Sequence, residues 1–143
     1  SQQLYLKVFD AYRPQKAVDH FSKWAKALND TLTKQKYYPN VHKTDLFRLQ
    51  YIASKAGHPR GSTIDLTLVD QNGNELDMGT TWDYFGPESW PLNTDISALA
   101  QKNRLILRNI MIKYGFKPYN EEWWHFTLKN EPFPNTYFDF DVK

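Results

Sequence analysis

Residues 57–69 read GHPRGSTIDLTLV and join a bent loop to an alternating strand. Two glycines and a proline surround His58 and mark the loop, because these residues interrupt regular structure. From residue 62 to 69, apolar side chains alternate with polar ones, which is the pattern of a strand that turns one face to a core. The stretch therefore predicts a sheet, with the carboxylate of Asp65 on the other face of its strand.

The rest of the chain supplies elements that can build and cover such a sheet. Hydrophobic spacing predicts strands at 4–9, 116–118 and 123–128 and helices at 17–28, 45–54 and 97–114. Asn72-Gly73 predicts a hairpin turn after the central strand. Thr94 or Asp95 is expected to cap the last helix, and Gly115 to end it. No linker divides the chain, so we expect residues 1–143 to form a single α+β domain.

The composition excludes several classes of protein. Hydrophobic residues make up 41% of the chain and charged residues 24%, as in soluble globular proteins. The formal net charge is +2 and the two signs are interspersed, so no basic block predicts a nucleic-acid partner. No apolar run reaches the roughly 18–20 residues of a membrane helix. The chain has no cysteine, which excludes disulfides and cysteine-bound metals.

Three residues in unusual local settings can form a metal site. His58 lies in the glycine- and proline-rich loop, Asp65 stands among apolar neighbours, and His125 lies inside an aromatic strand. A half-buried carboxylate is costly unless it is paired or bound to a metal. Two imidazoles and one carboxylate are a normal set for a catalytic zinc with an open fourth position. Two simpler interpretations remain: a His58–Asp65 hydrogen bond that fixes the loop, and His125 as a core histidine.

Glu122 is the candidate general base beside such a zinc site. It precedes His125 by three residues, and residues three apart in a regular strand point to opposite faces. The chain must therefore bend at Trp123, or Glu122 must precede the strand. The two other histidines, His20 and His42, are expected on the surface or in packing contacts.

These motifs together resemble the D-alanyl-D-alanine dipeptidases, which include enzymes associated with vancomycin resistance. The resemblance covers the chain from about residue 4 to its end and rests on DAYRP at 10–14, SKAGHPRGSTIDLT at 54–67, DMG at 77–79 followed by Trp82-Asp83, EWWH at 122–125 and PFPNTYFDF at 132–140. It implies the hedgehog/D-Ala-D-Ala-peptidase fold, an α+β scaffold with a central antiparallel sheet and flanking helices.

The resemblance also implies a role for each site residue. It places one zinc ion per chain on His58, Asp65 and His125, with Glu122 as catalytic base, Arg13 as the group that stabilises the oxyanion, and Asp83 as the carboxylate that holds the substrate's α-ammonium group. Ala56 departs from the family pattern, which has a serine here, two residues before the zinc histidine, that helps to bind the substrate carboxylate.

A second departure concerns the start of the chain. Family members normally begin well before the motif at 10–14, and the strand at 4–9 opens almost at the first residue. We therefore expect a missing N-terminal segment, or a second fragment of the same protein, to partner this strand.

The implied activity is that of a zinc metallodipeptidase that hydrolyses D-alanyl-D-alanine in peptidoglycan precursor turnover or glycopeptide resistance. We expect a bacterial protein, with the cytoplasm favoured over the periplasm. One alternative is a D,D-carboxypeptidase or wall endopeptidase of the same fold, which Asp83 disfavours because only a dipeptide needs its free amine held. Another is a non-catalytic zinc-containing module that binds peptidoglycan, which Glu122 disfavours because binding alone needs no base.

Overall fold

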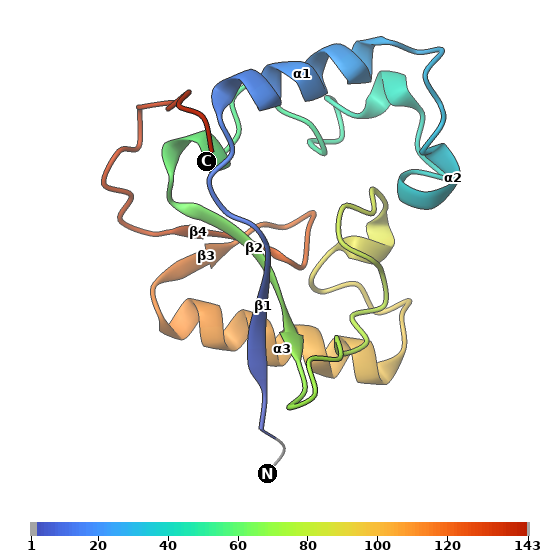
Figure 1. Cartoon of the computed structure of the whole chain (residues 1–143). Coiled ribbons are helices and arrows are strands. Elements are labelled where there is room, and N and C mark those ends of the chain that lie inside the picture. Colours follow the sequence, from blue (N-terminus) through green and yellow to red (C-terminus); the bar gives the residue numbers. More distant parts are fainter. Residues whose placement is uncertain (1–2, 143) are drawn as a thin grey trace.

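The computed structural model describes residues 3–142 and contains one four-stranded sheet in which all neighbouring strands are antiparallel (Figure 1). The strands follow the order β1 (Tyr5–Asp10), β2 (Thr63–Val69), β4 (His125–Leu128) and β3 (Phe116–Pro118). The predicted α+β class with a central antiparallel sheet is confirmed. The central strand β2 is buried along almost its whole length, so both of its faces meet other parts of the chain.

Helices lie on opposite sides of this sheet (Figure 1). The α-helices are α1 (Gln15–Lys26), α2 (Lys34–Tyr37) and α3 (Ala98–Lys113), and the 3-10 helices are η1 (Lys43–Asp45), η2 (His58–Arg60) and η3 (Pro87–Ser89). The long helix α3 packs against β2 and β3. Its N-cap is Ser97, whose Oγ accepts a hydrogen bond from the Ala100 N–H at 3.1 Å, so the expected cap at Thr94 or Asp95 is wrong. Gly115, at φ 88°, follows the helix as predicted.

The hydrophobic residues form two separate clusters. The first, the sheet cluster, consists of Leu66, Leu68, Met78, Leu107, Met111, Trp123, Trp124 and Phe126. The second, the loop cluster, consists of Ala25, Tyr38, Val41, Leu46, Tyr51, Ile52 and Phe85. The sheet cluster joins α3 to the sheet, and the loop cluster joins α1 to the irregular segments that follow it. The two clusters thus stabilise different parts of the chain.

The helix predicted at 45–54 is wrong. The chain forms η1 and a series of turns there, and Gln50 has a left-handed backbone conformation with φ 63°. An α-helix does not accommodate that conformation. Leu46 and Ile52 are nevertheless buried. The spacing of apolar residues therefore indicated which side chains are buried but did not predict the secondary structure.

Arg104 fixes the long loop from Gly79 to Pro91 to helix α3. This buried side chain donates to the carbonyl oxygens of Met78 at 2.6 Å, Glu88 at 2.8 Å and Trp90 at 2.9 Å. Burial lowers the pKa of Arg104 to about 10, so the guanidinium remains charged at neutral pH. Two of these charge-assisted bonds reach the loop and the third reaches Met78 just before it, so the loop has a defined position on the helix.

The edge strand β1 exposes apolar side chains. Leu6 is 51% exposed and Val8 is 52% exposed. The expectation that another polypeptide segment covers this edge stays a prediction. Within residues 3–142, none of the helices has the length and apolar character needed to span a membrane.

A buried hydroxyl on β2 generates a test of the packing. Thr67 is fully buried, and its Oγ1 has no hydrogen-bond partner within the described residues. Replacing it by the similarly shaped valine should leave the free energy of unfolding unchanged or raise it by up to about 1 kcal/mol, because no buried polar group is then left unpaired. Thr80→Val is the matched control. Its Oγ1 contacts the Trp123 Nε1 and the Ser89 Oγ, both at 2.9 Å, so this variant should lose about 1–3 kcal/mol.

Denaturant unfolding of both variants measures the difference. A loss of more than about 1 kcal/mol in Thr67→Val would show that this hydroxyl has a partner, such as a bound water.

Candidate functional site

The centre of the site is a row of residues that crosses three strands. In the sheet register, Asp65 of β2 lies opposite Asp10 of β1 on one side and opposite His125 of β4 on the other. Asp65 is 2% exposed, so its carboxylate lies in the interior of the protein. The strand pairing alone thus brings His125 to Asp65, although the two residues are far apart in the sequence.

His58 reaches the same carboxylate from η2. Its Nδ1 lies 2.6 Å from the carbonyl oxygen of Ala11, and an imidazole nitrogen at this position can only donate its proton to that oxygen. The bond fixes the tautomer and leaves Nε2 as the free nitrogen, which lies 3.3 Å from the Asp65 Oδ2. A histidine whose second nitrogen is held by a carbonyl is typical of a metal ligand.

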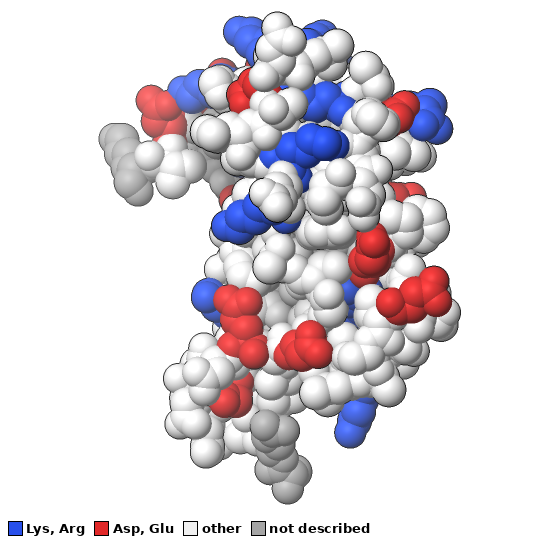
Figure 2. Space-filling model, turned by 90° about the vertical axis from the view of Figure 1, so that its right-hand side faces the viewer, with Lys and Arg blue, Asp and Glu red and all other residues white. Residues whose placement is uncertain are grey.

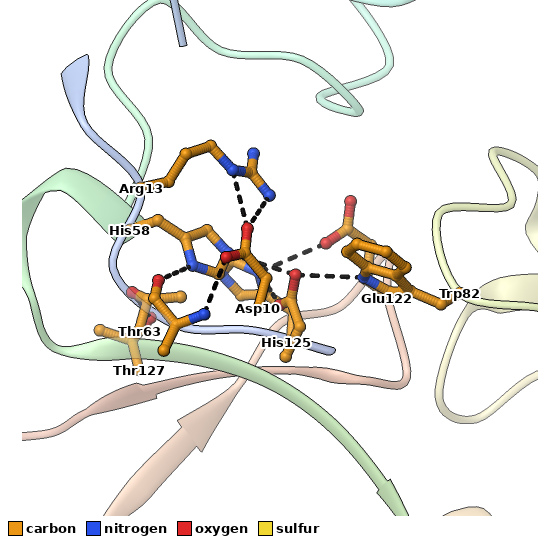
Figure 3. A network of polar contacts seen from close by, with 10 residues as sticks. Asp10, Arg13, His58, Thr63, Trp82, Glu122, His125 and Thr127 are labelled. Carbon is orange, nitrogen blue, oxygen red and sulfur yellow. Dashed lines mark hydrogen bonds and ion pairs between the residues drawn. The ribbon is translucent and has the colours of Figure 1, made fainter. Parts of the chain in front are cut away.

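His125 completes a compact group (Figure 3). Its Nδ1 lies 3.0 Å from the Asp65 Oδ1, and the rings of His58 and His125 are nearly perpendicular, with centroids 5.1 Å apart. One ligand atom from each of His58, Asp65 and His125 lies within 4.8 Å of the others. The structure therefore brings together all three residues that the sequence nominated.

The group fits a metal better than it fits a hydrogen-bond network. The Asp65 Oδ1 is buried and, within residues 3–142, has no partner with hydrogen-bonding geometry, in spite of its 3.0 Å approach to the His125 Nδ1. Such an arrangement is expected of atoms that converge on a cation rather than on one another. Burial opposes ionisation of Asp65, but its contacts with His125 and His58 outweigh burial and hold its pKa well below its usual range. Two imidazole nitrogens and an ionised carboxylate are ligands that zinc accepts.

Glu122 lies beside this group because it precedes the strand. β4 begins at His125, and the chain turns at Trp123 and Trp124 just before it. The Glu122 Oε2 consequently lies 3.4 Å from the His125 Nδ1, although the two residues are three apart. Burial raises the pKa of Glu122 well above its ordinary value, and the negative charges of Asp65 and Asp83 raise it further.

A cavity of about 300 Å³ opens at this group, and Tyr51, Ile52 and Phe85 of the loop cluster line part of its wall. Arg13 lines it, held by the Asp10 carboxylate, which accepts from its Nε at 2.8 Å and from its Nη2 at 2.5 Å. The wall opposite the sheet comes from α1 and the irregular segment 50–57. Figure 2 shows the face that lies on the right-hand side of Figure 1. Acidic and basic side chains are both present on this face, and uncharged residues predominate.

Asp83 lines the same cavity from the loop that Arg104 holds. Its backbone has φ 59°, a left-handed conformation that aspartate tolerates better than most residues. Burial, with the negative charge of Asp65, raises the pKa of Asp83 to about 7. An aspartate with a left-handed backbone conformation and a raised pKa is typical of a functional position.

Sequence reasoning missed the residues that support the ligands. Asp10 binds Arg13, and the Trp82 indole N–H donates to the Asp65 Oδ2 at 3.3 Å. The i, i+3 spacing of Asp10 and Arg13 was a usable signal for the first pair. Nothing local predicts the second, because it depends on how the long loop folds. His20 and His42 are exposed and do not line the cavity, as expected.

Comparisons with known proteins agree on one family. A family model described as D-ala-D-ala dipeptidase matches residues 1–143. The chain is 45% identical over 139 residues to a D-alanyl-D-alanine dipeptidase of Enterococcus faecium, a match that covers 96% of this chain and 69% of the relative. It is 46% identical over 138 residues to one of Enterococcus faecalis and 44% identical over 138 residues to one of Streptomyces coelicolor, with 96% of this chain and 68% of each relative covered.

The geometry of the site predicts metal binding. We expect zinc-supplemented protein to hold one zinc ion per chain, and the metal to raise the melting temperature because it binds only the folded state. His58→Ala should abolish both effects, since it removes a ligand. His42→Ala changes an exposed histidine outside the cavity and should preserve both.

Elemental analysis and thermal unfolding measure the two effects. Zinc bound equally by His58→Ala and by the wild type would exclude this site.

Proposed function

The chain belongs to the D-ala-D-ala dipeptidase family of metallopeptidases, and we propose that it hydrolyses D-alanyl-D-alanine with a zinc ion held by His58, Asp65 and His125. The observation that supports this most strongly is the convergence of these three ligand atoms on a cavity that Glu122, Arg13 and Asp83 also line. The cavity suits a dipeptide, a small substrate whose two ends carry opposite charges. A role in recycling wall-derived dipeptide in a bacterial cytoplasm is part of the proposal.

The fold positions the ligand residues before a metal binds. Ala11 holds the His58 ring through Nδ1, and the sheet register sets the His125 ring beside Asp65. Zinc bound by two histidines and a carboxylate supplies Lewis-acid polarisation of the scissile carbonyl and makes the attacking water more acidic.

Glu122 acts as the general base. Its carboxylate lies 3.4 Å from a proposed ligand atom, within reach of a water molecule placed at the centre. A carboxylate with a raised pKa accepts a proton more readily than an exposed one, and it can then donate that proton to the leaving amine. Both proton transfers need one group that faces the centre of the site, and Glu122 is the carboxylate so placed.

Arg13 stabilises the negative charge that develops on the carbonyl oxygen. Asp10 engages its Nε and Nη2, so Nη1 remains for a substrate in the cavity. The ion pair also restricts the side chain before substrate binds. A fixed guanidinium loses little freedom in the reaction, which is the condition under which such a charge stabilises a transition state.

Asp83 binds the free ammonium group of the dipeptide. Burial and the negative charge of Asp65 raise its pKa in spite of the positive charge of Arg13, so a further positive charge would stabilise the ionised carboxylate. A substrate ammonium supplies that charge, and the bond it forms is charge-assisted. This contact distinguishes a dipeptidase from a carboxypeptidase, whose substrates have an acylated amine at the corresponding position.

The role of Glu122 is tested by Glu122→Gln. Glutamine keeps the size and polarity of the side chain but cannot accept the proton, so kcat should fall about 10²- to 10⁴-fold while zinc stays bound. Glu121→Gln is the matched control, because Glu121 precedes it directly and does not line the cavity. Alanine release from D-Ala-D-Ala measures turnover in both variants. A loss of less than tenfold in Glu122→Gln at neutral pH contradicts the assignment.

The role of Asp83 is tested by substrate preference. Wild-type protein should cleave D-Ala-D-Ala much faster than N-acetyl-D-Ala-D-Ala, since a charge-assisted bond contributes about 1.5–3 kcal/mol. Asp83→Asn should narrow this ratio at least tenfold, chiefly by slowing the free dipeptide, and asparagine tolerates the left-handed backbone. Asp95→Asn, at an exposed position, is the control. Comparable wild-type rates on the two substrates would instead indicate a carboxypeptidase.

A further inference from the structure

The site has a hydroxyl group that the proposed function does not use. Thr127 lines the cavity, and its Oγ1 lies 2.8 Å from the Oγ1 of Thr63 on the neighbouring strand (Figure 3). Thr127 follows His125 by two residues on β4, and Thr63 precedes Asp65 by two on β2, so both lie on the face of the sheet that carries the site. Ala56 also lines this cavity and has no hydroxyl.

The proton of the Thr127 hydroxyl is directed into the cavity. Each threonine has one hydroxyl proton to donate. Thr63 is 4% exposed, and within residues 3–142 its hydroxyl has Thr127 as its hydrogen-bond partner. If Thr127 donated to Thr63, the Thr63 proton would be buried without an acceptor. The favoured arrangement is therefore a bond donated by Thr63, which leaves the Thr127 proton for a ligand.

Gly57 makes room for this pair. A Cβ atom at position 57 would lie 2.3 Å from the Thr63 Oγ1, a distance that forces the threonine to move. The Thr63 hydroxyl can therefore occupy its place only because Gly57 has no side chain. Gly57 directly follows Ala56, the position at which the family pattern has a serine.

The cavity that Thr127 lines also has cationic side chains that suit a carboxylate. Lys55 and Arg60 line the cavity, and both pack over the ring of Tyr137. Glu131 already accepts from Arg60 at 2.7 and 2.9 Å, whereas Lys55 has no carboxylate within 4.0 Å in the part of the chain that the structure describes. One cation among the residues that line the cavity is therefore available for an anionic group.

The spacing also matches the substrate. Two residues along a strand span about 7 Å, so the Cα atoms of His125 and Thr127 are about 7 Å apart. In the dipeptide, the carboxylate lies one residue beyond the scissile carbonyl, about 3.5 Å away. A hydrogen bond adds about 2.8 Å. With the scissile carbonyl at the ligand group, the carboxylate therefore reaches Thr127.

We propose that Thr127, held by Thr63, binds the C-terminal carboxylate of the substrate in place of the family's serine. The proposal rests on the dipeptidase function, and it assigns the end of the substrate opposite to the one bound by Asp83. In this chain the residue that binds the carboxylate lies on the strand after His125, whereas in the family pattern it lies in the loop before the zinc histidine.

Thr127→Val tests the proposal, because valine keeps the shape and removes the hydroxyl. A hydrogen bond to a charged group corresponds to about a 10- to 100-fold change in binding. We expect KM for D-Ala-D-Ala to rise by that factor with kcat nearly unchanged, and the inhibition constant of D-alanyl-D-alaninamide, which lacks the carboxylate, to stay within about twofold. Thr127→Ser keeps the hydroxyl and should keep the wild-type KM. Thr67→Val makes the same change outside the cavity and is the control.

Two results would contradict the role of Thr127. An unchanged KM in Thr127→Val overturns the proposal, as does an equal weakening of the acid and the amide. If wild-type protein releases no alanine, the dipeptidase function itself fails, and calorimetric binding of the same two ligands then decides the role of Thr127 without any turnover.

Discussion

The buried carboxylate of Asp65 is the constraint on which the rest of the site depends. An ionised group in the interior is stable only if charged or hydrogen-bonding groups surround it. The sheet register supplies His125 from β4, and η2 supplies His58, while the register on the other side places Asp10 of β1 opposite Asp65. Asp10 in turn holds Arg13, and Trp82 donates to Asp65 from the long loop. A slip of one residue in either strand pairing would turn these groups to the opposite face.

Much of this arrangement could be predicted from the sequence, because it follows from local patterns. Alternation of apolar and polar residues identified β2 and placed Asp65 on the face away from the sheet cluster. Helical spacing and Gly115 identified α3. The clash between strand geometry and the Glu122–His125 spacing predicted either a bend at Trp123 or a glutamate ahead of the strand, and the structure shows both. Residue types and unusual local settings nominated the three ligands as a possible metal site, and the family resemblance implied that they hold one zinc ion together.

The remaining features depend on contacts between distant segments, which no local pattern encodes. The segment 45–54 has helical spacing but folds as turns, since its apolar side chains pack into the loop cluster while Gln50 takes a left-handed conformation. The position of Asp83 depends on Arg104 of α3, which binds two carbonyl oxygens of the loop and that of Met78 just before it. The Thr63–Thr127 pair appears only when β2 and β4 are placed side by side.

The central claim is that His58, Asp65 and His125 hold the zinc ion of a dipeptidase. X-ray diffraction from zinc-loaded crystals, collected on both sides of the zinc absorption edge, tests it most directly. We expect one strong anomalous peak per chain, about 2.0–2.2 Å from the His58 Nε2, an Asp65 oxygen and the His125 Nδ1. A peak bound by other residues, or a fully ordered site without a peak, would contradict the claim.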